Sequence, residues 1–188
     1  MKKLNKREGI KFLGLFGLPI VQLIDTRDVI NGNLDISVGV SIRTSPKYAT
    51  SRNVWLPSIH NCTNLSDITN FIEDHEIIYD VIIHKTVVPI SIGSVSKVES
   101  FHKSFLMLET YRNFEDRKSG NIHNRLTIPY IGERSLVRFI ELERHDPIEY
   151  MDFIRVFRYL RKLPFETYNL EYVVEDEKIL FTDFTVGW

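Results

Sequence analysis

The chain has 188 residues with 24 basic and 25 acidic side chains, so its formal net charge is -1, and 43% of its residues are hydrophobic. This length suits one domain with a real core, and the apolar fraction is too high for a disordered chain. The near-neutral charge argues against a protein that relies on a basic excess to bind nucleic acid. The single cysteine, Cys62, excludes an internal disulfide framework and a cysteine-rich metal site.

The first apolar segment follows a basic start and could be mistaken for a signal peptide. Pro19 and Gln22 interrupt the run from Phe12 to Ile24, no small-residue cleavage site follows it, and it is shorter than the ~20 residues that span a bilayer. We therefore interpret residues 10–24 as a buried strand or an apolar docking segment. The expected location is cytoplasmic or within a virion, with no secretion and no transmembrane segment.

Strand patterns dominate the rest of the chain. Residues 34–42 alternate between apolar and polar, and the Asn31-Gly32 dipeptide before them predicts a hairpin with residues 19–30. Residues 168–174 and 179–186 flank a charged turn and predict a C-terminal hairpin over 168–186. The remaining strand candidates are rich in β-branched and aromatic residues: 77–92, 101–111, 125–131 and the ambiguous 136–142.

Two helices are expected. The first begins after Thr63 or Asn64 and places Leu65, Ile68, Phe71 and Ile72 on one face. The second begins at the cap Asp146 and Pro147, and it ends before Pro164. Its apolar stripe recurs at spacings of three and four: Tyr150, Phe153, Ile154, Phe157 and Leu160.

The polar stretches 43–53 and 113–121 are expected to be loops, and neither is long enough to separate domains. The pattern therefore predicts a single domain over residues 1–188. Its fold class is α+β: a β-rich antiparallel or mixed sheet with two helices packed on one face.

Most motifs with a known chemical mechanism are missing from the sequence, including the phosphate-binding glycine loops and the helical zinc motif. Cys62 precedes the first helix and could be a nucleophile with His60 as its base, although a capping-region cysteine with no catalytic role is the simpler interpretation. Residues 73–76 group a histidine with three carboxylates, which could hold a metal or simply form a solvated helix end. We expect no metal and no cofactor.

The most specific constellation is the pair of tripeptides His84-Lys85-Thr86 and His102-Lys103-Ser104. A hairpin turning at Gly93-Ser94 would place His84 opposite Ser104 and Thr86 opposite His102. This pattern resembles the paired H-x-[ST] motifs of the 2H phosphoesterase family. The resemblance implies an alternative function, cleavage of phosphodiesters at RNA ends or in cyclic oligonucleotides, with two imidazoles as acid and base.

A second alternative is a nucleic-acid-binding accessory protein. The basic side chains Arg155, Arg158 and Lys162 share the outer face of the second helix with Tyr159, and such a face can contact phosphates and bases. The simpler explanation is that cations near a helix C-terminus complement the helix dipole.

The favoured interpretation is a non-enzymatic structural or assembly subunit of a larger complex, most concretely a phage or virus particle component. The chain holds 12 Phe, 8 Tyr and 2 Trp, which is more than one modest core needs, and aromatic residues are enriched at interfaces. The expected partners are other protein subunits in a homo- or hetero-oligomer. Nucleic acid is a less favoured partner, and no membrane is expected.

Overall fold

The computed structural model describes residues 4–33, 35–47, 56–100, 103–130, 147–164 and 166–186. The chain divides into two compact units, unit 1 with residues 1–9 and 21–87, and unit 2 with residues 10–20 and 88–188. The chain passes between the units after residues 9, 20 and 87, and none of these points is a Gly/Ser-rich or Pro-rich linker. The expected single domain over residues 1–188 rested on the absence of such linkers, and it stays a prediction.

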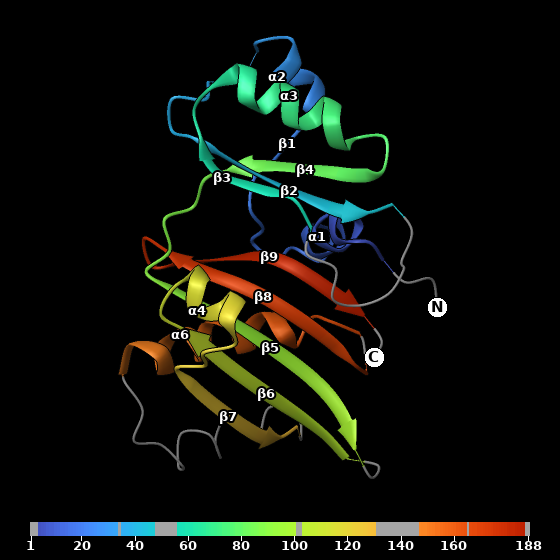
Figure 1. Ribbon diagram of the computed structural model, residues 1–188. Helices are drawn as coiled ribbons and strands as arrows, with labels where there is room; N and C mark the ends of the chain where they lie inside the picture. The colour runs from blue at the N-terminus through green and yellow to red at the C-terminus, as the bar shows by residue number, and fades with distance from the viewer. Residues whose placement is uncertain are drawn as a thin grey trace. The chain divides into compact units, whose positions relative to one another are not determined.

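Unit 1 is a four-stranded antiparallel sheet covered on one face by two helices (Figure 1). The strands follow the order β1-β4-β2-β3. Apolar side chains of β2 and β4 pack with α2 and α3 in one core that includes Ile42, Ile68, Ile72 and Ile83. The elements are β1 (Leu23–Ile24), α2 (Thr26–Ile30), β2 (Val40–Pro46), β3 (Ser58–Cys62), α3 (Leu65–His75) and β4 (Tyr79–Lys85).

Helix α3 begins where the sequence predicts. The Asn64 side chain accepts a hydrogen bond of 2.9 Å from the backbone N–H of Ser66, which satisfies one of the free donors of the first turn. The next turns place Ile68 and Ile72 against the sheet, and both are fully buried. The local cap and the apolar stripe therefore agree, and this agreement makes α3 predictable from sequence.

Unit 2 is a five-stranded antiparallel sheet in the order β7-β6-β5-β8-β9. Helix α1 begins in unit 1 and contributes residues 10–15 to unit 2. The elements of unit 2 are α1 (Lys6–Leu15), β5 (Ser91–Ser100), β6 (Lys103–Tyr111), α4 (Phe114–Ser119), β7 (Asn124–Pro129), α6 (Pro147–Leu160), β8 (Tyr168–Glu175) and β9 (Lys178–Val186).

The two faces of this sheet differ. Helix α6 lies behind the sheet in Figure 1, and its buried Phe153 and Phe157 belong to the apolar core on that side. Ser91 of β5 donates a hydrogen bond of 3.0 Å to Asp152 of α6, which fixes the face that the odd-numbered residues of β5 present. Gly93 lies on this face, directly under the ring of Tyr172. The short helix α4 lies in front of the opposite face.

The predicted fold class is confirmed, because the structure is α+β with antiparallel sheets and helices against them. Strands β6 and β7 and the C-terminal hairpin of β8 and β9 lie where they were expected. The structure has two sheets rather than one. The ambiguous segment 136–142 and the helix cap Asp146 lie outside the described residues.

Several local predictions are wrong. Residues 10–15, the start of the segment interpreted as a buried strand or an apolar docking segment, belong to a helix over residues 6–15, and Ile10 and Leu13 on one face of it are buried. The expected hairpin at Asn31-Gly32 does not form, because Asp25 caps α2 and the Asn-Gly dipeptide ends that helix, with Gly32 at φ 69°. Part of the predicted loop 43–53 belongs to β2, and part of the loop 113–121 forms α4.

The predicted strand over 77–92 is divided between β4 and β5, which belong to different sheets. Strand β4 ends at Lys85, and β5 begins at Ser91 after Pro89, which cannot donate a ladder hydrogen bond. Gly93 and Ser94 therefore lie inside a strand and form no turn. Strand β5 pairs instead with β6, with Ser100 opposite Lys103.

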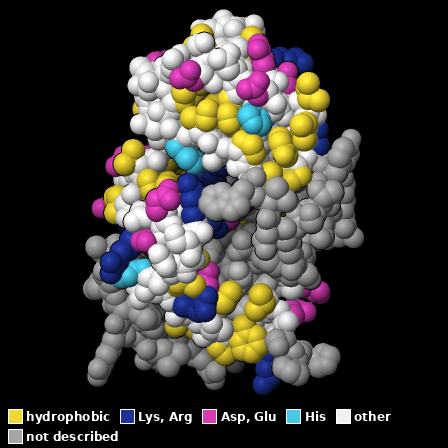
Figure 2. Space-filling model, in the orientation of Figure 1, with side chains coloured by type: hydrophobic (Ala, Val, Ile, Leu, Met, Phe, Trp, Pro, Cys, Tyr) yellow, Lys and Arg dark blue, Asp and Glu magenta, His cyan; other side chains and the backbone are white. Residues whose placement is uncertain are grey.

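In the described part of the chain, no helix has both the length and the apolar character that crossing a membrane requires. Large hydrophobic side chains are exposed at single positions in both units, among them Ile77, Ile78, Val88 and Ile90. Figure 2 shows hydrophobic side chains bordered by acidic, basic and histidine side chains on the face in view. Such scattered exposure is normal for folded proteins.

Candidate functional site

A row of polar residues crosses all five strands of unit 2. Successive Cα partners along this row are Arg125 of β7, Glu109 of β6, Ser94 of β5, Glu171 of β8 and Asp183 of β9. Because directly paired residues point to the same side of a sheet, all five side chains lie on the face opposite α6. We call this set the charged row.

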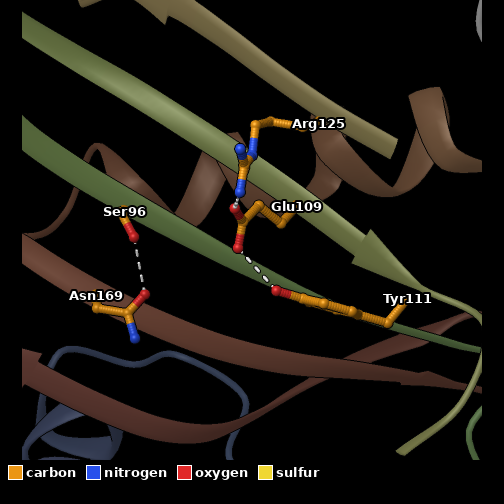
Figure 3. A network of polar contacts seen from close by, with 5 residues as sticks. All are labelled: Ser96, Glu109, Tyr111, Arg125 and Asn169. Atoms are coloured by element: carbon orange, nitrogen blue, oxygen red, sulfur yellow. Dashed lines mark hydrogen bonds and ion pairs between the residues drawn. The ribbon is translucent and has the colours of Figure 1, made fainter. Parts of the chain in front are cut away.

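A second row, polar except for Met107, lies beside it on the same face, two residues along each strand. Its members are Thr127, Met107, Ser96, Asn169 and Thr185. Ser96 donates a hydrogen bond of 2.9 Å to the side-chain oxygen of Asn169 (Figure 3). The sheet therefore has an apolar face that packs against α6 and an opposite face whose side chains suit a polar ligand.

At one end of the charged row, Glu109 is held by three donors. Arg125 donates from Nε and Nη2 to Oε1 at 2.9 and 2.6 Å, and the Tyr111 hydroxyl donates to Oε2 at 2.7 Å (Figure 3). Burial, together with the hydrogen bond to Glu109, raises the pKa of Tyr111 above its ordinary value of 10.0. Glu109 is therefore a satisfied structural carboxylate.

At the other end, Glu171 and Asp183 are direct partners on adjacent strands. Asp183 is 9% exposed, and its Oδ1 accepts a hydrogen bond of 2.9 Å from the backbone N–H of Phe184. Glu171 forms an ion pair with Arg117 of α4. Cβ atoms of directly opposed residues lie about 5 Å apart, so the two carboxylates can reach one cation between them.

This pair fits the coordination that Mg²⁺ favours. Magnesium keeps several waters and is usually held by one or two carboxylates together with substrate phosphates. Among the described residues, no group of three or more His, Cys, Asp or Glu side chains could hold a metal by itself. A cation at Glu171 and Asp183 would therefore need oxygen ligands from water and from a phosphorylated substrate.

Unit 1 holds a second polar cluster on the sheet face opposite α2 and α3. Here Arg43 of β2 and His84 of β4 each have a buried nitrogen, Nε and Nε2, and in the described part of the chain these are the two buried side-chain nitrogen or oxygen atoms without a hydrogen-bond partner. Ser41 is the Cα partner of His84, and its hydroxyl lies 3.2 Å from that of Thr86. Buried polar atoms without partners are rare, and each one calls for an explanation.

The protonation of His84 follows from its contacts. Its Nδ1 lies 2.7 Å from the carbonyl oxygen of Lys85, which can only accept, so Nδ1 carries the proton. Burial, reinforced by the charge of Arg43, lowers the pKa of His84 from 6.5 to about 4. At neutral pH the ring is uncharged, and Nε2 offers a lone pair beside the N–H donor of Arg43.

The structure separates the residues of the two tripeptide motifs. His84 pairs with Leu23 and Ser41 in the sheet of unit 1, whereas Ser104 pairs with Glu99 in the sheet of unit 2. Thr86 follows the end of β4, and His102 lies outside the described residues. The hairpin on which the predicted cluster of His84, Thr86, His102 and Ser104 depended is therefore not formed.

Two of the three basic side chains predicted on the second helix have contacts within unit 2. Arg155 donates to the carbonyl oxygen of Glu177 at 3.1 Å and lies 3.7 Å from Asp152. Lys162 lies over the ring of Tyr159, and Arg158 is exposed. Arg155 and Tyr159 also line a cavity of about 250 Å³ next to residues 177–180. A role for these side chains in nucleic-acid binding stays a prediction.

The other candidates belong to the packing of unit 1. Cys62 is buried in the core beside Val40, and its thiol lies 3.6 Å from the carbonyl oxygen of Asn64. His75 stacks on Phe71 with ring centroids 4.3 Å apart, and its Nδ1 lies 2.8 Å from the Phe71 carbonyl oxygen.

Sequence reasoning missed the pair Glu171 and Asp183. The signal was present, because Asp183 interrupts an apolar run in which Phe181 and Phe184 are buried, and an acidic residue in such a strand is unusual. Glu171 alternates with Leu170 and Tyr172, which marks it as facing away from the core. The pairing register that brings the two together follows only from the fold.

The chain was also compared with known proteins. No protein-family model and no curated protein match it. By structure it is similar to ACD1 of Ca. Korarchaeum cryptofilum in complex with coenzyme A, with a TM-score of 0.67 and 10% identity, covering 98% of this chain and 92% of that chain. It is also similar to D-alanyl-alanine synthetase A from Vibrio cholerae, with a TM-score of 0.53 and 10% identity, covering 94% of this chain and 52% of that chain.

A third similar structure is N5-carboxyaminoimidazole synthetase from Staphylococcus aureus complexed with ADP, with a TM-score of 0.53 and 12% identity, covering 95% of this chain and 43% of that chain. These neighbours are ATP-grasp-type synthetases and ligases. The finding overturns the interpretation as a non-enzymatic phage or virus particle subunit. The chain therefore shares the fold of these proteins.

Proposed function

We propose that this protein is an ATP-grasp-type enzyme that binds a nucleoside triphosphate with a divalent cation at the charged row. The observation that carries this proposal is the direct pairing of Glu171 and Asp183 on the polar face of the five-stranded sheet. Structures with the same fold hold Mg-AMPPCP, Ca-AMPCP or ADP, which supports a nucleotide as the ligand. The reaction class would be that of an ATP-dependent ligase or synthetase.

The residues of the row would have distinct roles. Glu171 and Asp183 would hold the cation from one side, while nucleotide phosphates and water complete its ligands. When bound, the cation neutralises charge that develops on the phosphate oxygens. Ser94 lies between Glu109 and Glu171 in the row and offers a hydroxyl donor to the same ligand. The paired Arg125 and Glu109 would keep the sheet face rigid beside the site.

The test is calorimetric titration of the full chain with Mg-AMPPCP. Replacing one carboxylate by its amide keeps the shape of the side chain and removes the charge that holds the cation. We expect Glu171→Gln and Asp183→Asn each to weaken binding about tenfold or more, the scale seen when support of a metal site is lost. Glu177→Gln is the matched control, because Glu177 lies in the turn of the same hairpin with its side chain 86% exposed.

Two results would refute this proposal. One is an absence of Mg-AMPPCP binding by the wild-type chain at millimolar concentration. The other is binding by both amide variants that equals the wild type and does not change when EDTA removes the cation. Thermal unfolding of each variant separates a lost site from a lost fold.

A second binding role is favoured by the unpartnered nitrogens in unit 1. We propose that Arg43 and His84 bind a substrate group that accepts one hydrogen bond and donates another, as a hydroxyl or a protonated phosphate does. Arg43 Nε can only donate, and the lone pair of His84 Nε2 can only accept while the ring is neutral. A ligand group with both functions satisfies both atoms.

Titration with inorganic phosphate tests this role, read from the imidazole nitrogen signals of His84. Phosphate should shift these signals in the wild type, and the shift should be lost in Arg43→Gln. The control is Arg27→Gln, because Arg27 is exposed on α2 in the same unit. His84 signals that do not respond to phosphate, or that respond equally in Arg43→Gln, would disprove it.

A further inference from the structure

Arg117 of helix α4 forms an ion pair with Glu171, one of the two carboxylates proposed to bind the metal. The helix has six residues, from Phe114 to Ser119, and lies between β6 and β7. Its Arg117 forms an ion pair with Glu171, and the two side chains are 29% and 17% exposed. The guanidinium also lies 5.7 Å from the ring centroid of Tyr111. Arg117 thus places a positive charge beside the charged row.

Helix α4 lies at the surface of unit 2. It contains no buried residue, and its ends are closed by its own cap residues, with Asn113 accepting from the Asp116 N–H at 2.8 Å and Gly120 ending the helix at φ 72°. Its other basic residue in the last turn, Lys118, pairs with Glu115 in the same helix at 3.0 Å. Arg117 is therefore the residue of α4 whose described contacts join the helix to β8.

We infer that Arg117 is an internal counter-ion that competes with the divalent cation for Glu171, so that cation binding releases Arg117 from Glu171 and loosens α4 from the sheet. This inference rests on the proposed function, because it takes Glu171 and Asp183 as the metal-facing pair. The negative charges of Glu171 and Asp183 repel each other, and a nearby positive charge stabilises them both in the metal-free and in the metal-bound protein. In the free protein Arg117 supplies that charge, and in the loaded protein the metal supplies it.

The competition has a consequence for selectivity. Any cation that enters must replace the charge-assisted contact between Arg117 and Glu171, which is a stronger interaction than a neutral hydrogen bond. A divalent ion offers two charges to the pair, whereas a monovalent ion offers only what Arg117 already provides. The ion pair therefore sets a threshold that favours divalent over monovalent cations.

The decisive measurement is the affinity of the full chain for Mn²⁺ alone, read by electron paramagnetic resonance. Arg117→Gln removes the competitor, so Mn²⁺ should bind about threefold to tenfold more tightly than to the wild type, the range expected for loss of a partly exposed charged contact. Lys118→Gln removes the same charge from the same helix and should leave the affinity unchanged. Arg117→Lys keeps the charge and should stay close to the wild type.

A second measurement reports on the helix. Hydrogen exchange of the amides in residues 116–121 should become faster in the wild type when Mg-AMPPCP is added, and it should already be fast in Arg117→Gln without ligand. A structural role of Arg117 alone would predict weaker Mn²⁺ binding and no response of the helix to the ligand.

The outcomes separate this inference from the proposed function. Wild-type binding of Mg-AMPPCP that is lost in Asp183→Asn, together with unchanged or weaker Mn²⁺ binding by Arg117→Gln, would disprove the counter-ion role and leave the function standing. Failure of the wild type to bind Mg-AMPPCP would remove both. Tighter Mn²⁺ binding by both Arg117→Gln and Lys118→Gln would show a general charge effect and would also contradict the inference.

Discussion

Glu171 of β8 and Asp183 of β9 are direct Cα partners, so two carboxylates stand side by side on the polar face of the five-stranded sheet. Like charges placed opposite each other on a sheet are destabilising, and a nearby cation offsets the repulsion. Arg117 provides that charge for Glu171 in the structure described here. The proposals of a metal site, a nucleotide ligand and a counter-ion role for Arg117 all depend on this pair of neighbouring carboxylates.

Replacing His84 should change how stability depends on pH. The folded pKa of about 4 lies below the unfolded value near 6.5, so the unfolded chain binds the proton more readily. The stabilisation from the neutral ring is fully present above pH 6.5 and is lost as the pH falls towards 4. In His84→Gln, urea unfolding should show about 2 kcal/mol less loss of stability between pH 7 and pH 4.5 than the wild type.

The control for this experiment is His123→Gln, because His123 is exposed. A pH profile of His84→Gln that is parallel to the wild type would show that His84 does not titrate as its burial requires.

Gly93→Ala should destabilise unit 2. A Cβ at this position would collide with the ring of Tyr172, which is fully buried on the neighbouring strand and cannot move aside. The expected loss is about 1–3 kcal/mol in urea unfolding. A double-mutant cycle with Tyr172→Leu checks the cause, because the penalty of Gly93→Ala should shrink when the ring is removed. If the losses of stability from Gly93→Ala and Tyr172→Leu are additive, the collision with the Tyr172 ring is not the cause of the destabilisation.

Asn64→Ala should weaken helix α3 at its first turn. The variant loses the side-chain acceptor of the Ser66 N–H, and loss of such a cap costs about 1 kcal/mol. Asn70→Ala tests the same chemical change in the middle of the helix, where Asn70 is exposed and alanine favours helix. Chemical denaturation should therefore show opposite signs for the two variants, and equal losses would contradict the capping role.

Glu109→Gln should lower the pKa of Tyr111. Burial is the first cause of the raised value and remains, but the hydrogen bond to a carboxylate and its negative charge are removed. The shift can be followed by NMR of carbon-labelled tyrosine, with Tyr168 as an internal reference because its pKa is raised mainly by burial. A Tyr111 titration unchanged by Glu109→Gln would exclude the carboxylate as a cause.

The sequence by itself determined those helices and strands that are specified by neighbouring residues, such as a helix cap or an alternating apolar run. Helix α3 has a cap and an apolar stripe at helical spacing, and the hairpin of β8 and β9 has two alternating runs around a charged turn, so each was predicted within a few residues. The same local reasoning failed at Asn31-Gly32, because a turn dipeptide and a helix end both place glycine at positive φ. It also missed the helix over residues 6–15, because the apolar run over 10–24 was interpreted as a buried strand or an apolar docking segment.

The tertiary structure alone decided which strands pair and therefore which side chains meet. The run over 77–92 is continuous in hydrophobicity, yet its two halves join different sheets, and this removed the basis of the predicted histidine cluster. Strand alternation fixes only the face on which a residue lies, whereas its neighbours across the sheet depend on a register set by distant segments. Glu171, Asp183 and Arg117 carry recognisable chemistry in the sequence, but only the register of β8 against β9 and the position of α4 bring them together.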